Sequence, residues 1–299
     1  MISETLMIIA EQVLLYLPLV LGAYINIAMM KVPDLSIETA YVFGSIFGAR
    51  MLFFTSNLPS LVSLKLVLFA AVVGGACVGL LSSALTKVAR LPHLLSCILT
   101  IGIFHGLNQL VLGTASLSIS HLNNPLITQS VFPSNPEFFT LAVLGFVLLA
   151  LGYLLLRTQL GFAFAVYGNN PRFFDHYHIS QKFVFMVGIM LSNALAGISG
   201  YLVAQTSGFT DINAGFGMAL FCITSLILGK TCVRSKRLFS ISIPLIGIIV
   251  YCLLQQLLLK VGFNLKYFTM VQSIIVMCVL IRQFRTVSST ESIVDNLGV

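Results

Sequence analysis

Two short polar groups interrupt a chain that is otherwise strongly apolar. Asp34, Ser36 and Glu38 form the first group, and Asp211 and Asn213 form the second. Side chains of Asp, Ser and Asn accept hydrogen bonds from the free amides of a helix's first turn, and Asp there also suits the helix dipole. Capping alone explains both groups. The alternative is that a helix is broken at each polar group and that the two breaks are gates or hinges of a path across a membrane. Capping and gating are compatible.

Further polar side chains lie inside the long apolar segments. Such side chains either join neighbouring helices by hydrogen bonds or line a polar path, and packing is the simpler explanation for each one. They are His93, His105, Asn108, Gln109, Asn193, Gln205, Gln255, Gln256 and Gln272. The candidates for a translocation path or gate are Asp34, Ser36, Glu38, Asn193, Gln205, Asp211 and Asn213.

Acidic residues are scarce in the apolar segments, and this bears on the energy source. Apart from the two polar groups, only Glu11 lies in or beside such a segment. A carrier coupled to protons or sodium ions usually needs titratable groups inside the membrane. The sequence therefore favours an energy source outside this chain.

No arrangement typical of catalysis, metal binding or nucleotide binding is evident. The six cysteines are scattered without CxxC or Cys/His ligand spacing, so neither a metal site nor a disulfide framework is expected. Residues 226–231 end like a phosphate-binding loop, but that motif needs a glycine where Thr224 stands and a strand before it. We expect no catalytic residue, no metal and no cofactor in this chain.

The composition indicates a membrane protein. Of 299 residues, 58% are hydrophobic and 8% charged, whereas a soluble domain is nearer a quarter charged. A helical span takes about 20 apolar residues. The segments that qualify are 6–30, 61–86, 91–113, 138–156, 183–205, 211–229, 239–259 and 267–283, with a more polar candidate at 34–53. We expect an all-α integral membrane protein with about 8–9 transmembrane helices and a single domain over residues 1–299.

The net charge of +7 follows from membrane topology and does not indicate a nucleic-acid partner. If all nine segments cross and the N-terminus is outside, most basic residues lie on the inner side, as the positive-inside rule predicts. The inner set is Lys31, Lys87, Arg90, Arg157, Arg172, Lys182, Lys230, Arg234, Lys236, Arg237, Arg282 and Arg285, and the outer set is Arg50, Lys65, Lys260 and Lys266. We expect an outer N-terminus and a cytoplasmic C-terminus.

The two polar groups belong to a weak internal repeat. An offset of 177 residues aligns Tyr24 with Tyr201 and Asp34 with Asp211. The expected layout is repeat 1 (about 6–113), an outer loop (114–137), a linking helix (138–156), a cytoplasmic loop (157–182), repeat 2 (about 183–285) and a cytoplasmic tail (286–299). Because the linking helix has no counterpart, the repeats should be inverted. Inverted repeats with broken or re-entrant helices are typical of transporters.

The loop at 157–182 is polar and rich in aromatic residues. Asn170 and Pro171 form a good helix start, because Asn caps and proline at the first position loses no hydrogen bond. A helix continuing to about His178 would present Phe173, Phe174 and Tyr177 on one face. Such an exposed face needs a cover, which would be lipid headgroups, the protein itself or another subunit.

The same loop carries a family resemblance that extends over nearly the whole chain. The matching motifs are Leu160-Gly161-Phe162-Ala163, Gly168-Asn169-Asn170-Pro171 and LSNALAGISGYLVAQTSGFTDINAGFG at 191–217. They resemble motifs of ABC importer permeases in the branched-chain amino acid and ribose permease superfamily. The chain most resembles the branch associated with aromatic amino acids such as tryptophan or tyrosine.

The resemblance implies an inner-membrane permease that takes up a small solute by alternating access. It implies a separate ATPase subunit that holds ATP and Mg²⁺, an extracytoplasmic solute-binding protein, and a second copy of this chain as a homodimer. The loop would dock on the ATPase through Asn170, Pro171, Arg172, Phe173, Phe174, Asp175, Tyr177 and His178. The scarcity of charge in the spans favours a neutral or zwitterionic solute, and an amino acid-like one fits the resemblance.

Departures from the family pattern fall within this loop. Ala165 stands where the family has a basic residue, Phe173-Phe174 where it has Ala-Ala, and His178 where it has glycine. The bulkier residues imply either a reshaped groove on the partner or a loss of coupling. The alternative functions are a stand-alone carrier or channel that works without an ATPase, and a membrane scaffold without transport.

Overall fold

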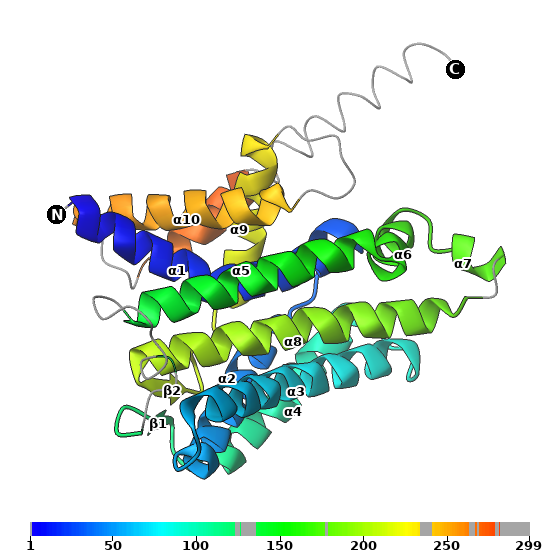
Figure 1. The fold of residues 1–299 in the computed structure, drawn as a ribbon. Helices are drawn as coiled ribbons and strands as arrows, with labels where there is room; N and C mark the ends of the chain where they lie inside the picture. The colour runs from blue at the N-terminus through cyan, green and yellow to red at the C-terminus, as the bar shows by residue number, and fades with distance from the viewer. Residues whose placement is uncertain are drawn as a thin grey trace.

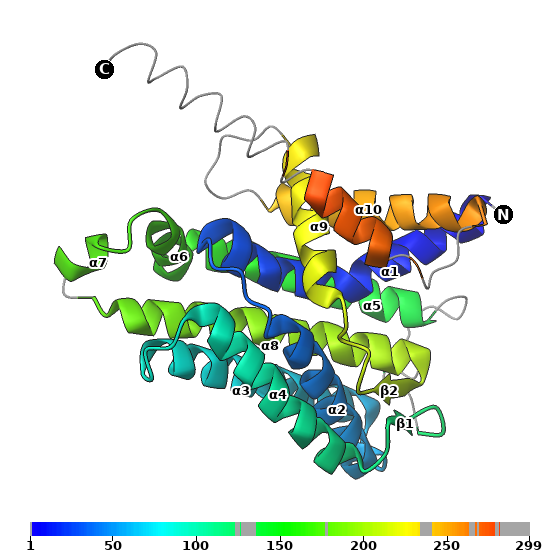
Figure 2. The same ribbon diagram turned by 180° about the vertical axis from the view of Figure 1, so that it is seen from behind.

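The computed structural model describes residues 2–122, 126, 136–176, 179–233, 241–262, 267, 269–278 and 281. Most of them are helical (Figures 1 and 2). The first half comprises α1 (Ile2–Ala23), the π-helix η1 (Tyr24–Met29), α2 (Ile37–Thr55), α3 (Ser60–Lys87), α4 (His93–Leu112), β1 (Ser116–Ser118) and α5 (Pro136–Arg157). The second half comprises α6 (Gln159–Asn169), α7 (Phe173–His176), α8 (Gln181–Ser207), β2 (Phe209–Asp211), α9 (Met218–Cys232) and α10 (Ser242–Lys260). The tail at 286–299 and most of the outer loop lie outside the described residues.

Seven helices in the described part of the chain are long and apolar enough to cross a membrane. They are α1 with η1, α2, α3, α4, α5, α8 and α10, and two shorter apolar helices are α9 and Thr269–Cys278. A helix satisfies its backbone polar groups internally, which the bilayer requires of any spanning segment. The prediction of an all-α membrane protein is confirmed.

The order of the helices follows the 177-residue offset found in the sequence. α2 ends at Thr55 and α9 ends at Cys232, which are separated by that same offset. α1 and α8, which precede the two breaks, pack against each other and run in opposite directions (Figure 1). Their opposite directions are those that inverted repeats require.

The two breaks are built differently. After η1, Lys31 has a φ of 56°, and Pro33 cannot donate a helical hydrogen bond, so the helix ends before α2 begins. After α8, Gly208 adopts a φ of 77° and leads into β2, which pairs antiparallel with β1. The segment expected to span at 211–229 therefore begins with strand and turn. Only the 15-residue α9 is helical there, and it is too short to cross a bilayer alone.

α2, α3 and α8 are in close contact at the centre of the molecule. Gly44 of α2 faces Gly197 of α8, and a Cβ at Gly44 would overlap the backbone of Gly197. In membrane proteins small residues allow such close approach of helix backbones. This close packing places the break at 30–36 in the interior of the molecule, beside α8.

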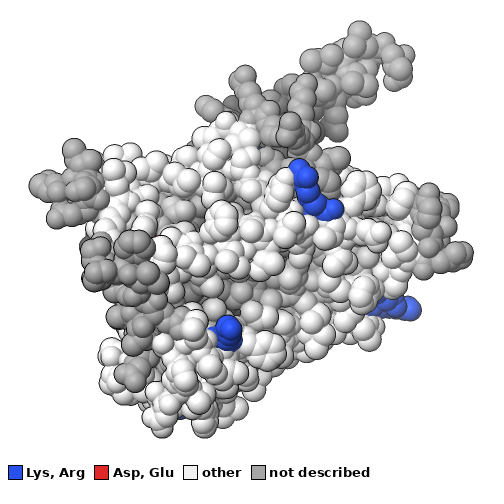
Figure 3. Space-filling view, in the orientation of Figure 1, with Lys and Arg blue, Asp and Glu red and all other residues white. Residues whose placement is uncertain are grey.

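The face of the molecule in Figure 3 is mostly uncharged. Basic side chains appear there at isolated places, and no acidic side chain is seen among the described residues of that face. Many large apolar side chains of α3, α4 and α5 are exposed, including Phe69, Leu110 and Phe146. Lipid is the solvent that such a surface suits.

Candidate functional site

Asp34 is the centre of a buried polar cluster in the first break. Only 4% of its surface is exposed. Its Oδ1 accepts hydrogen bonds from the Ser36 backbone N (2.8 Å) and hydroxyl (2.6 Å), and its Oδ2 accepts from Nδ2 of Asn26 (3.3 Å) and Nδ2 of Asn193 (2.8 Å). A buried carboxylate is costly unless it is hydrogen-bonded in this way. The cluster joins η1, the break and α8, and it brings together three of the predicted path residues.

The capping predicted from the sequence takes another form here. Ser36 is the N-cap residue of α2, but its side chain makes no capping bond to the helix and its hydroxyl donates to Asp34. Asp34 makes the local bond, by accepting from the Ser36 amide two residues on, which is an Asx-turn. Asp34 therefore stabilises the turn that starts α2.

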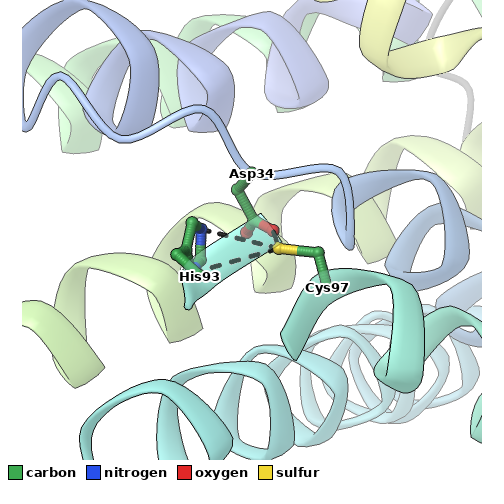
Figure 4. A group of neighbouring side chains, drawn as sticks. All are labelled: Asp34, His93 and Cys97. Atoms are coloured by element: carbon green, nitrogen blue, oxygen red, sulfur yellow. Dashed lines mark hydrogen bonds between the residues drawn. The ribbon is translucent and has the colours of Figure 1, made fainter. Parts of the chain in front are cut away.

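Two side chains of α4 complete the cluster from the other side (Figure 4). The Cys97 thiol donates to Oδ1 of Asp34 at 3.3 Å, and Nε2 of His93 lies 3.5 Å from the same sulfur. The potential ligand atoms of Asp34, His93 and Cys97 all lie within 4.8 Å of one another. The sequence analysis missed this group. The i, i+4 spacing of His93 and Cys97 on one helix face was the available signal, but only the fold adds Asp34.

Glu38 binds the second repeat, although the sequence suggested that it caps its own helix. Its Oε1 accepts from the backbone N of Gly217 (3.1 Å) and of Ala219 (3.3 Å) at the start of α9. A carboxylate at a helix N-terminus satisfies free amides and interacts favourably with the helix dipole. Glu38 thus connects the start of α2 to the start of α9.

The remaining predicted path residues lie elsewhere. Gln205 is buried and accepts from the Tyr201 hydroxyl within α8 (2.8 Å), which indicates packing. The Asp211 carboxylate accepts a hydrogen bond from the backbone N of Asn213 in a local turn (2.6 Å). Asn213 lines a half-open cavity of about 430 Å³, together with His105 and Gln109 of α4.

The predicted docking helix begins at Phe173 and not at Pro171. α7 comprises Phe173–His176, while Asn170, Pro171 and Arg172 are exposed residues before it. Tyr177 and His178, and the side chain of Asp175, lie outside the described residues. Phe173 is 39% exposed, but Phe174 is only 2% exposed. The prediction that both rings share an exposed face is wrong, because neighbouring helical residues point about 100° apart.

The loop that contains α6 and α7 contacts the first break directly. Lys31 Nζ donates to Oδ1 of Asn169 at 2.8 Å. Gly168 packs so closely on the backbone of Met29 that a Cβ there would overlap the Met29 carbonyl. A movement of α6 would therefore reach η1 and the residues that hold Asp34.

Comparison with known proteins agrees with this architecture. The family model described as "Branched-chain amino acid transport system / permease component" matches residues 5–280. The chain belongs to this family. It is accordingly a multi-pass membrane protein of a permease family, and several of its relatives are named as permease proteins of transport systems.

Individual relatives match this chain over most of its length. An uncharacterized protein of Rickettsia prowazekii is 28% identical over 85% of this chain and 89% of its own length. The tyrosine transport system permease protein of Clostridioides difficile is 30% identical over 71% of this chain and 68% of its own length. The galactofuranose transporter permease protein of Escherichia coli is 27% identical, over 74% of this chain and 64% of its own length. No solved structure matches.

Proposed function

We propose that this chain is the permease subunit of an inner-membrane ABC importer for a small neutral or zwitterionic solute, driven by a separate ATPase subunit. The observation that carries the proposal is the contact between the 157–182 loop and the first break, through Lys31 and Asn169 and through Met29 and Gly168. An ATPase that moves the loop would move the break with it. ATP and Mg²⁺ would be held by that partner, and an extracytoplasmic binding protein would deliver the solute.

An amino acid-like solute fits best within this proposal. A relative that covers 71% of this chain is named a tyrosine transport system permease protein. In this chain Tyr16, Phe221 and Tyr251, with Gln255 and Gln272, line a cavity of about 180 Å³ beside the start of α9. Aromatic walls with a few amide groups suit a small solute that has both an apolar and a polar part.

Docking of the ATPase should depend on the exposed part of the loop. We expect Arg172→Glu/Phe173→Ala to lose most of the ATPase that co-purifies with the tagged wild type, because Arg172, just before α7, and Phe173, the first residue of α7, are both exposed. The measurement is the amount of co-purified ATPase in mild detergent, with size exclusion as the check on folding.

Phe174→Ala is the matched comparison. Phe174 is buried, so its truncation should lower stability by about 3–5 kcal/mol, as Phe→Ala changes in cores do, without removing a contact surface. Equal co-purification by Arg172→Glu/Phe173→Ala and wild type would contradict docking at this loop.

The outward face of α4 supports a homodimer. His105 and Gln109 are exposed and lie 3.4 Å apart, and a Cβ at Gly102 or Gly106 would meet nothing within 4 Å. Polar side chains on a spanning helix are poorly suited to lipid, and small residues allow a second helix to approach. We propose that a second copy covers this face and that the solute path runs beside it.

A larger residue on this face should therefore block pairing without harming the fold. Gly106→Leu meets open space within one chain, so the protomer should fold, while the dimer should be replaced by monomer. Ala150→Leu places the same leucine side chain at an exposed position of α5 and should stay dimeric. Light scattering coupled to size exclusion measures the mass. An unchanged dimer in Gly106→Leu would remove α4 from the interface.

The alternative function is a stand-alone carrier. The group of Asp34, His93 and Cys97 favours it, because such carriers use titratable groups in the membrane. Uptake by vesicles that contain only this chain separates the two functions. ATP-independent uptake that responds to a proton gradient would establish the carrier. Uptake that requires an added ATPase would establish the importer.

A further inference from the structure

We propose that Asp34, His93 and Cys97 form a binding site for a divalent d-block cation of the Zn²⁺ type. The site goes beyond the transport function and departs from the expectation of no metal drawn from the sequence. It combines one carboxylate oxygen, one imidazole nitrogen and one sulfur, all within 4.8 Å of one another. These are the three ligand types that zinc uses, in the number that leaves a fourth tetrahedral position open.

The hydrogen-bonding pattern around His93 leaves its Nε2 available as a ligand. Thr86 donates its hydroxyl hydrogen to the Ser82 carbonyl (2.9 Å), so its oxygen can only accept from Nδ1 of His93, which lies 3.1 Å away. The hydrogen of the neutral imidazole is then on Nδ1. Its other nitrogen, Nε2, then carries the free lone pair and lies 3.5 Å from Cys97 Sγ, which is 4.0 Å from Nδ1.

Three potential ligand atoms thus lie close together, and of the three only the Cys97 sulfur carries a hydrogen. The thiol donates this hydrogen to Asp34 Oδ1, and His93 Nε2 lies beside the same sulfur. Binding of a divalent cation would replace that thiol proton, which leaves to solvent. The cation, the thiolate and the carboxylate then sum to zero charge around a neutral imidazole, which suits a site removed from water.

Neighbouring groups already orient the ligands. Ser36, Asn26 and Asn193 hold the Asp34 carboxylate, as Thr86 holds His93. Hydrogen bonds that fix the ligands from behind are characteristic of metal sites and contribute to affinity. Asn26 and Asn193 are also 1% and 0% exposed, and their Oδ1 atoms have no hydrogen-bond partner in the described structure. These oxygens are further potential ligand atoms for the cation beside the carboxylate.

Binding would join the break at 30–36 to the start of α4. Asp34 lies in the break, and His93 and Cys97 lie in the first two turns of α4. If the break is a moving part of the importer, the cation would restrain it and slow transport. That consequence rests on the proposed function, whereas the binding itself does not.

The test is a titration of the purified full-length chain with Co²⁺, which replaces zinc and reports a bound thiolate by its sulfur-to-metal charge-transfer absorption. We expect one Co²⁺ per chain, displaced by Zn²⁺. The absorption should be lost in Cys97→Ser and the affinity reduced in His93→Gln. Cys77→Ser and His105→Gln are the matched controls, since both side chains are exposed and neither belongs to the group of potential ligands, and both variants should bind as wild type.

Thr86→Val keeps all three ligands and removes the bond to His93, together with the Thr86 bond to the Ser82 carbonyl within α3. It therefore remains informative if a ligand variant fails to fold. It should weaken binding by about 10–100-fold, the usual effect of losing a hydrogen bond that orients a ligand. Wild type without the sulfur-to-metal absorption, or absorption that persists in folded Cys97→Ser, would overturn the site. Neither result depends on an ATPase or on transport.

Discussion

Asp34→Leu is expected to prevent the permease from folding, whereas Asp34→Asn should leave it folded. Leucine removes the acceptor for the Ser36, Asn26 and Asn193 donors and for the Cys97 thiol in the protein interior. Each buried donor left without a partner costs about 1–3 kcal/mol, and several together approach the whole stability of a typical domain. Yield of monodisperse protein and melting temperature in detergent measure the effect.

The asparagine variant isolates hydrogen bonding from charge. Its side-chain oxygen can replace Oδ1 of Asp34, while its amide stands where Oδ2 accepts from Nδ2 of Asn26 and of Asn193. One of these two side-chain amides must turn so that its Oδ1, which has no partner in the described structure, accepts from the new amide. We expect Asp34→Asn to fold with a lower melting temperature than wild type and without the metal affinity.

Asp211→Leu is the matched control for the leucine change, because Asp211 occupies the corresponding position of the second repeat. Its carboxylate is partly exposed and accepts from the Asn213 amide in a local turn. The loss of one such turn or cap bond costs about 0.5–2 kcal/mol, so this variant should fold. Equal melting temperatures for Asp34→Leu and Asp211→Leu would show that the buried cluster does not stabilise the fold.

Gly168→Ala is expected to reduce transport at least about tenfold while ATPase docking is retained. Overpacking costs about 1–3 kcal/mol, and about 1.4 kcal/mol at a contact that must move corresponds to a tenfold change in rate. The added Cβ would overlap the Met29 carbonyl, which is backbone and cannot turn aside. α6 and η1 must then separate, so a movement of the loop is transmitted less directly to the break. Solute uptake into vesicles with the ATPase present measures the effect, and co-purification checks docking.

Gly152→Ala on α5 provides the comparison. A Cβ there would lie 3.8 Å from Leu21 and 3.9 Å from Ile241, which is ordinary contact. Alanine is the better helix former by about 1 kcal/mol, so Gly152→Ala should transport as wild type and melt slightly higher. Normal transport by Gly168→Ala would rule out this contact as the connection between loop and break.

The helical architecture was predictable from the sequence because the bilayer permits few alternatives. Apolar segments of about 20 residues without internal charge must form helices there, and the nine predicted segments all contain helix. The breaks were predictable as well, since Pro33 cannot donate a helical hydrogen bond and a glycine such as Gly208 readily adopts the positive φ that ends a helix. These are local properties, and local sequence is enough to show them.

The partners of each polar side chain were decided by the tertiary structure alone. Asp34 meets Asn193 and Cys97, and Glu38 caps α9, because glycines let α2 and α8 approach closely and so bring segments that are distant in the sequence together. Capping, packing and ligand binding use the same residue types, so a sequence read segment by segment does not choose among them. The sequence determined that this chain crosses the membrane and where its helices break. Only the packing of distant segments decided which side chains meet there, since such contacts depend on the positions of whole helices.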